Sequence, residues 1–346
     1  MSAQNRACGA LTFLVSVVVG LGLIPLPVAA QYKVTNLVSS QAGKAKHQDP
    51  DLINAWGIAY APSVPFCVAD TGTGLATFYD AQGVKQSPVI TVPSTSTHHG
   101  TPTGIVYNGT TDFQVSQGGH SGPAMFIFDT IDATISGWNS SVNSNTAIVV
   151  VNNSGSGASY TGLAIGVSQG ANFIYAADHK NKKVDVYDGA FNFVKSFTDP
   201  NLPADSAPFN LRTINGQLYV AFTSPKIGGA VDVFDMAGNL IKTLTSGSKL
   251  KGPWGLAIAP ANFGPASKAL LVGNLIDGRI NAFDATTGKF IGPLTSPQGK
   301  IISEGGLWAT TFGGGTPQNG KTNQLFFASG PNYEKAGLFG VISYKK

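Results

Sequence analysis

Three histidines offer the densest group of side chains that could do acid–base or metal chemistry in this sequence. His98 and His99 are adjacent, and His120 follows in the same stretch of the chain. Imidazoles brought together in this way would suit a transition metal, and one of them could act as a general base. The alternative is that they are solvated loop residues, because neighbouring residues in an extended segment point in opposite directions.

Four oxygen-bearing side chains form a second candidate group. Asp70, Asp178 and Asn274 each directly follow a short apolar run that is typical of a strand, and Asn210 lies within another such run. Carboxylate and amide oxygens are the ligands that a hard cation such as Ca²⁺ prefers, so these four residues are candidate metal ligands. The alternative is that each of them only caps its own turn.

Three tryptophans open further apolar runs. Trp56, Trp254 and Trp308 each stand at or near the start of a segment of the form Trp-Gly-Ile-Ala or a close variant. Indole rings can form the floor of a site for a sugar or an aromatic ligand, and packing between structural units explains them equally well.

The composition limits the classes of protein that these residues could serve. Of the 346 residues, only 12% are charged, and the formal net charge is +4. A charge this small, with no basic block, argues against a nucleic-acid partner. A hydrophobic content of 42% argues against wholesale disorder.

Residues 1–30 have the order of a secretory signal peptide. Arg6 is followed by the apolar run 11–24, by two prolines, and by small residues that end at Ala30. The run is shorter than the roughly 20 residues that span a bilayer, although a retained membrane anchor is the alternative. We therefore expect a secreted protein, extracellular or periplasmic, with no membrane contact after cleavage. Cleavage leaves Cys67 as a single cysteine in an apolar run, where we expect a buried, inert thiol.

The elements that must position these side chains form a repeat. Six units, about 50 residues apart, each contain a Gly-bearing apolar run, a second apolar run, a third run that ends in an aromatic residue and Asp, and often a fourth. Period-two alternation, as in 184–187, predicts strands. In the second unit, we expect the second strand at 112–115 and the third at 124–129. The aromatic residue should pack between units, and the Asp should cap the next turn.

This repeat predicts an all-β, six-bladed β-propeller with four-stranded blades, in a single domain over residues 31–346. The last unit has three strands, and the segment 32–38 is a strand without a unit of its own. Pairing the two would close the ring and cover an exposed edge. A seven-bladed ring or a pair of β-sandwiches is the alternative.

Several ordered motifs resemble a family of exported bacterial conserved hypothetical proteins, some of which carry a C-terminal sorting tail. The resemblance covers essentially the whole mature chain. The family is in turn similar, more loosely, to NHL-type propellers. It implies the propeller fold without an assigned activity. Because the chain ends at Lys346 without such a tail, we expect free secretion. The motifs that carry the resemblance are Asn54–Ala59, Pro102–Val106, Ile135–Trp138, Phe197–Pro203, Ala207–Asn210, Gly252–Ala257, Leu271–Asn274, Asp277–Ala282, Gly306–Trp308 and Gly337–Gly340.

Two functional interpretations remain open at this point. The first is a non-catalytic binding or scaffolding module, a monomer with an extracellular glycan or protein as its ligand, because few titratable side chains converge. The second is a metal-assisted hydrolase or lyase, such as a lactonase-like enzyme, with Ca²⁺ held by the four oxygen donors and a base among the three histidines. The propeller fold itself is compatible with either interpretation.

Overall fold

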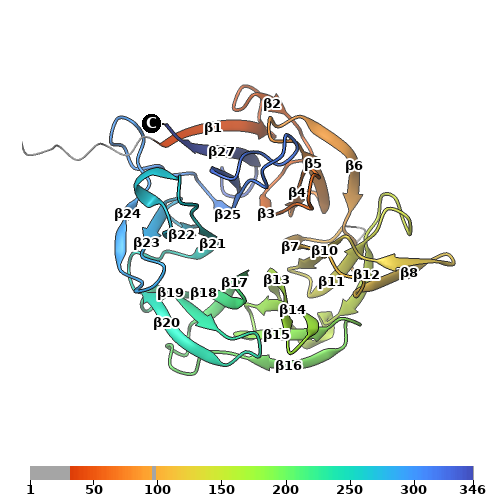
Figure 1. Ribbon diagram of the computed structural model, residues 1–346. Helices are drawn as coiled ribbons and strands as arrows, with labels where there is room; N and C mark the ends of the chain where they lie inside the picture. Colours follow the sequence, from red (N-terminus) through yellow and green to blue (C-terminus); the bar gives the residue numbers. More distant parts are fainter. Residues whose placement is uncertain (1–31, 96–98, 346) are drawn as a thin grey trace, which may run out of the picture.

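Six antiparallel sheets surround a central axis in the computed structural model, which describes residues 32–95 and 99–345 (Figure 1). The predicted six-bladed propeller with four-stranded blades is therefore confirmed. The predicted signal peptide and His98 lie outside the described residues. Within the described ranges, no helix has the length and apolar character needed to cross a membrane.

In blades 1 to 5, the first strand of each blade lies nearest the axis and the fourth lies at the rim (Figure 1). The strands of the first three blades are, in blade 1, β3 (Ala55–Ala59), β4 (Phe66–Asp70), β5 (Leu75–Tyr79) and β6 (Lys85–Thr91); in blade 2, β7 (Pro102–Tyr107), β10 (Phe126–Thr130), β11 (Thr134–Trp138) and β12 (Ile148–Asn152); and in blade 3, β13 (Tyr160–Ser168), β14 (Ala171–Asp178), β15 (Lys183–Asp188) and β16 (Phe193–Phe197).

The remaining blades follow the same order, except that the outer strand of blade 6 comes from the start of the described chain. Two short 3₁₀ turns, η1 (Ser154–Ser156) and η2 (Gly264–Ala266), lie in connections. The strands are, in blade 4, β17 (Ala207–Ile214), β18 (Gln217–Ser224), β19 (Gly228–Phe234) and β20 (Leu240–Ser246); in blade 5, β21 (Pro253–Ile258), β22 (Leu270–Asn274), β23 (Ile280–Phe283) and β24 (Phe290–Pro293); and in blade 6, β25 (Leu307–Phe312), β26 (Gln324–Ser329), β27 (Leu338–Tyr344) and β1 (Tyr32–Ser39), with β2 (His47–Gln48) beside β1.

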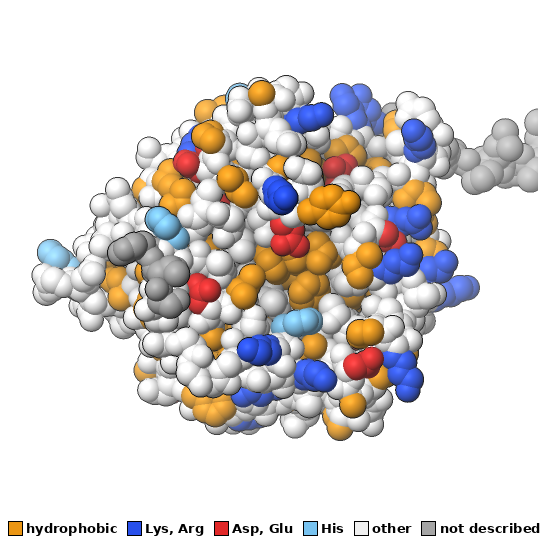
Figure 2. All heavy atoms as spheres, turned by 180° about the vertical axis from the view of Figure 1, so that it is seen from behind, with side chains coloured by type: hydrophobic (Ala, Val, Ile, Leu, Met, Phe, Trp, Pro, Cys, Tyr) orange, Lys and Arg blue, Asp and Glu red, His pale blue; other side chains and the backbone are white. Residues whose placement is uncertain are grey.

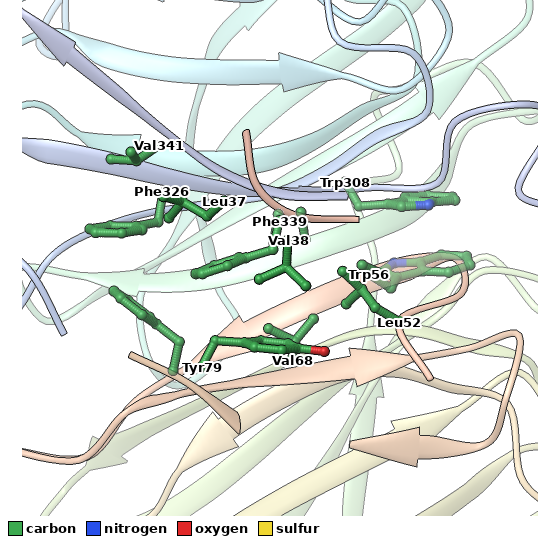
Figure 3. Close-up of a cluster of buried hydrophobic side chains, with 14 of the residues drawn as sticks. Leu37, Val38, Leu52, Trp56, Val68, Tyr79, Trp308, Phe326, Phe339 and Val341 are labelled. Carbon is green, nitrogen blue, oxygen red and sulfur yellow. The ribbon is translucent and has the colours of Figure 1, made fainter. Parts of the chain in front are cut away.

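The first and last described strands meet in blade 6, as the sequence predicts. β1 pairs antiparallel with β27, with Val34 opposite Ile342 and Val38 opposite Phe339. Val38 is fully buried and packs in a hydrophobic cluster that includes Trp56 (Figure 3). This pairing covers the edge that β27 would otherwise expose, and it closes the ring without a disulfide.

Blade 2 differs from the expected strand assignment. The second strand is β10, and β11 and β12 are the third and fourth strands, so the run 124–129 does not form the third strand. β8 (Gln114–Gln117) and β9 (His120–Pro123) form a separate hairpin that projects from the rim (Figure 1). The turn from β10 to β11 places Ala133 at a φ of 64°, a conformation that alanine rarely adopts, so the sequence carries no turn signal there.

The aromatic–Asp endings of the third strands behave as predicted in blades 1, 3, 4 and 5. Tyr187 is buried between blades, and the carboxylate of Asp188 accepts hydrogen bonds from the backbone N–H groups of Ala190 and Asn192, both at 2.9 Å. Side-chain caps of this kind fix tight hairpins. The equivalent aspartates make the same kind of contact after Tyr79, Phe234 and Phe283, and they are Asp80, Asp235 and Asp284.

Candidate functional site

The six innermost strands enclose a cavity of about 340 Å³ on the propeller axis. Every blade contributes at least one aliphatic side chain to its wall, including Ile58, Ile105, Leu163, Leu211, Leu256 and Ala309. A volume of this size lies near the lower end of the roughly 300–1,000 Å³ typical of ligand pockets. The cavity is therefore large enough for a small molecule.

Glycine in the first strands keeps the ring around this cavity narrow. A Cβ atom on Gly57 would collide with the backbone oxygen of Thr103 in the next blade, and one on Gly104 would collide with the backbone nitrogen of Leu163. Only glycine lets adjacent inner strands approach this closely. The recurring glycine that marked the repeat in the sequence thus has a direct role in shaping the axial cavity.

The three candidate tryptophans converge where the inner strands begin. The rings of Trp56 and Trp308 stack with centroids 3.5 Å apart (Figure 3), and Trp254 meets Trp308 edge-on at 6.3 Å. They are only 4%, 2% and 5% exposed, respectively. The face at this end has hydrophobic side chains at its centre (Figure 2). Trp254 lines the cavity at this end, and the contacts among the three indoles are the interblade packing that the sequence also allowed.

A single guanidinium dominates the charge of the cavity. Arg212, on β17, donates two hydrogen bonds from Nη1, to the backbone oxygens of Leu256 at 2.9 Å and Thr310 at 3.0 Å. Its Nη2 donates to the hydroxyl of Thr311 at 3.0 Å. The side chain thereby ties three blades together across the axis, and burial lowers its pKa from the usual 12.5. All three partners are uncharged, so none of them neutralises the cation.

The neighbours of Arg212 include two further polar side chains. The hydroxyl of Tyr60 donates to the backbone oxygen of Phe312 at 3.0 Å. Burial raises the pKa of Tyr60, and the Arg212 charge partly offsets that increase. The buried hydroxyl of Thr310 also belongs to a cavity-lining residue, and it has no hydrogen-bond partner in the described structure. The Thr310 hydroxyl is buried away from the cavity space, so Arg212 is the polar group that distinguishes this end of the cavity.

The cavity has a route to the surface on the Arg212 side. Tyr60, Arg212 and Thr213 line both the cavity and an adjoining groove of about 280 Å³. That groove reaches the exposed turn residue Asn215. The cavity thus has one end lined by Trp254 and another that leads outward past the guanidinium.

The predicted oxygen ligands lie in separate blades, and most of their contacts are local. Asp70 accepts a hydrogen bond from Thr77, and Asp178 accepts one from the backbone of Asn181. Asn274 donates to the backbone oxygen of Lys249 at 3.0 Å. Within residues 32–95 and 99–345, no group of three His, Cys, Asp or Glu side chains could hold a metal. The fourth candidate, Asn210, lines the cavity and donates to the backbone oxygen of Trp254 at 2.7 Å.

The two described candidate histidines do not converge. His120 begins β9 in the hairpin that projects from the rim, and His99 is an exposed residue of the connection between β6 and β7. The expectation that they meet rested on the wrong strand assignment in blade 2, because the hairpin is an insertion. His179, which the sequence did not single out, packs on Phe209 beside the tryptophans, and burial lowers its pKa.

Two charged residues in the interior of the ring were missed by reasoning from the sequence. Arg212 lies in the apolar run 209–214. The presence of an arginine inside a predicted innermost strand was the feature of the sequence that could have identified it as a site residue. Asp129 is fully buried in β10 and accepts hydrogen bonds from Thr103 and Gly104; burial raises its pKa to about 6. Cys67 is fully buried, as predicted, and burial raises the pKa of its thiol.

Comparisons with known proteins find other structures of this architecture. No family model matches the chain. Among solved structures, a structural genomics protein of unknown function from Bacteroides thetaiotaomicron VPI-5482 has a TM-score of 0.58 at 10% identity, covering 90% of this chain and 76% of that one. Virginiamycin B lyase from Staphylococcus aureus has a TM-score of 0.52 at 13% identity, covering 86% and 82%. At these identities the likeness shows the propeller fold alone.

The sequence itself has a clearer relative. The uncharacterized protein R648 of Acanthamoeba polyphaga mimivirus is 30% identical over 335 residues, which cover 92% of this chain and 82% of the viral protein. Since this relative is viral, membership in an exported bacterial family stays a prediction. The chain belongs to the same family as the mimivirus protein R648.

Proposed function

We propose that this protein is a secreted, non-catalytic binding module that holds a small ligand in its axial cavity. The observation that carries the proposal is the cavity itself, which has a wall from every blade, tryptophans at one end and an outward route at the other. Its volume of about 340 Å³ suits a small molecule better than the glycan or protein considered from the sequence. Secretion rests on the signal-peptide pattern of residues 1–30.

The enzymatic alternative has less support. Arg212 and Tyr60 are ionisable residues of the cavity wall, and burial raises the pKa of Tyr60, so its hydroxyl is a poor base at neutral pH. The candidate bases His99 and His120 lie on separate surface segments. The likeness to a lyase is a likeness of fold, and it carries no argument for lyase chemistry in this chain.

The test is to obstruct the cavity and measure binding. Thr213 lines both the cavity and the groove and is only partly buried, so Thr213→Trp should fill the route. The substitution also removes the hydrogen bond from the Thr213 hydroxyl to the backbone oxygen of Ile165, so circular dichroism must first show that the variant is folded. Thr245→Trp is the matched control, because Thr245 is also partly buried but lies on β20 at the rim. Thermal-shift screening of the purified protein against small acids, amides and monosaccharides gives the starting set of ligands.

The expected result is that compounds which stabilise the wild type lose at least tenfold in affinity for Thr213→Trp and keep their affinity for Thr245→Trp. Titration calorimetry measures both affinities. If no compound stabilises the wild type, or if all of them bind Thr213→Trp unchanged, the axial cavity is not the binding site and the proposal fails.

A further inference from the structure

We propose, on the basis of this binding function, that the ligand is a small organic acid whose carboxylate pairs with Arg212. The glycan, protein and Ca²⁺ ligands expected from the sequence are not small anions. The hydrogen-bond donors of Arg212, the charge around it and the shape of the cavity all favour a ligand of this class.

The guanidinium has two donors to spare. Of its five N–H groups, two on Nη1 and one on Nη2 are used by Leu256, Thr310 and Thr311. Within the described structure, the Nε–H group of Arg212 and the second N–H of its Nη2 donate to no protein atom. Nε and Nη2 form one edge of the guanidinium plane, and a carboxylate matches such an edge with two parallel hydrogen bonds. The three contacts that are present hold the side chain in place for this pairing.

The charge of Arg212 is also unbalanced. The ion pairs in the described residues join Lys85, Lys183, Lys251 and Arg279 to aspartates, and Arg212 takes part in none of them. A cation removed from water without an opposite charge is unfavourable, which is why burial lowers its pKa. An anionic ligand would supply the missing negative charge inside the cavity.

Beyond Arg212, the cavity wall is partly apolar and partly polar. Aliphatic side chains from all six blades form its wall, and Trp254 contributes to the end opposite the entrance. The indole N–H of Trp254 already donates to the backbone oxygen of Thr161 at 2.8 Å, so the ring offers the ligand an apolar surface. These features favour a compact monocarboxylate over inorganic phosphate, which has no apolar part.

The experiment compares acids with their uncharged counterparts on the wild-type protein. Benzoate and hexanoate are titrated against benzamide and hexanamide by calorimetry at pH 7, with inorganic phosphate as a further probe. The expected result is that each acid binds at least tenfold more tightly than its amide, because the amide lacks the charge that pairs with Arg212. Phosphate should bind more weakly than either acid.

Substitutions then locate the effect. Arg212→Met keeps an apolar stem and removes the charge, and it should lower affinity for the acids at least tenfold while leaving the weak binding of the amides unchanged. Arg279→Met is the matched control, because Arg279 pairs with Asp277 away from the cavity, and it should bind like the wild type. Circular dichroism checks that each variant is folded. If Arg212→Met does not fold, the acid–amide comparison on the wild type still decides the question.

The outcomes separate this inference from the function on which it rests. If acids and amides bind the wild type equally well and both are lost in Thr213→Trp, the cavity binds ligands but the carboxylate assignment is wrong. If phosphate binds most tightly and depends on Arg212, the anion is a phosphate and the assignment is also wrong. If no probe or library compound binds at all, the proposed function itself fails.

Discussion

Replacing Asp232 with asparagine should stabilise the protein at pH 8 and change its stability little near pH 4. Asp232 lies on β19, it is 0% exposed, and its carboxylate lies close to the side chains of Thr243 and Asp199. Burial raises the pKa of Asp232 from 3.8 to about 7, and the nearby carboxylate of Asp199 adds to the increase. The neutral acid is therefore the form that the fold accommodates.

The magnitude follows from linkage between protonation and folding. Since the pKa of Asp232 is higher in the folded than in the unfolded chain, the folded protein binds the proton more tightly. The contribution of protonated Asp232 to the free energy of unfolding is fully present below the pKa of this group in the unfolded chain, near 4. This contribution falls as the pH rises toward 7, and it is lost above that pH. A difference in pKa from 3.8 to about 7 corresponds to about 4 kcal/mol at 1.36 kcal/mol for each tenfold step in acidity. Asparagine cannot ionise, so the variant avoids this loss.

Urea unfolding between pH 4 and pH 8 measures the effect, with Asp188→Asn as a control of opposite sign. At Asp188, burial raises the pKa but is outweighed by hydrogen bonds from Asn192 and Ala190, and the pKa is lowered. Asp188→Asn should therefore destabilise the protein at neutral pH, with the difference closing as the pH falls. A stability difference between Asp232→Asn and the wild type that does not change with pH would refute the reasoning.

Two further predictions concern the two ends of the chain. Leu37→Ala should lower the free energy of unfolding by about 2–5 kcal/mol, because Leu37 is 1% exposed in the strand that closes the ring. Thr35→Ala, in the same strand but only partly buried, should lower it far less. Equal, small losses for both variants in urea unfolding would argue against closure by β1. N-terminal sequencing of the protein recovered from outside the cell should begin at Gln31, and an intact Met1 would contradict signal cleavage.

The repeat, the closure and the turn caps could be predicted from the sequence because their causes are local or periodic. Alternating apolar residues mark strands, and the Asp188 carboxylate caps a turn only a few residues away. The segment 32–38 could be assigned to blade 6 because the last unit lacks a strand and an uncovered edge is unfavourable. Blade 2 could not be assigned correctly, since Phe128-Asp129 imitates the ending of a third strand although Asp129 binds Thr103 and Gly104 instead.

The candidate site was harder to predict because it depends on contacts between blades. Asp70 and Asp178 occupy matching places in the repeat, but the strands that they end are set one strand away from the axis, so their side chains serve local turns. Arg212 has partners in blades 5 and 6, which lie far along the chain from β17. Its missing counter-ion is a property of the assembled ring, and only the strand position of the arginine could have indicated it.

A crystal structure of the wild-type protein with benzoate tests the central claim most directly. We expect a benzoate in the axial cavity, with its carboxylate oxygens within about 3 Å of Nε and Nη2 of Arg212 and its ring against Leu211 and Leu256. Benzoate bound at the rim, or an axial cavity that contains the ligand with its carboxylate turned away from Arg212, would contradict it.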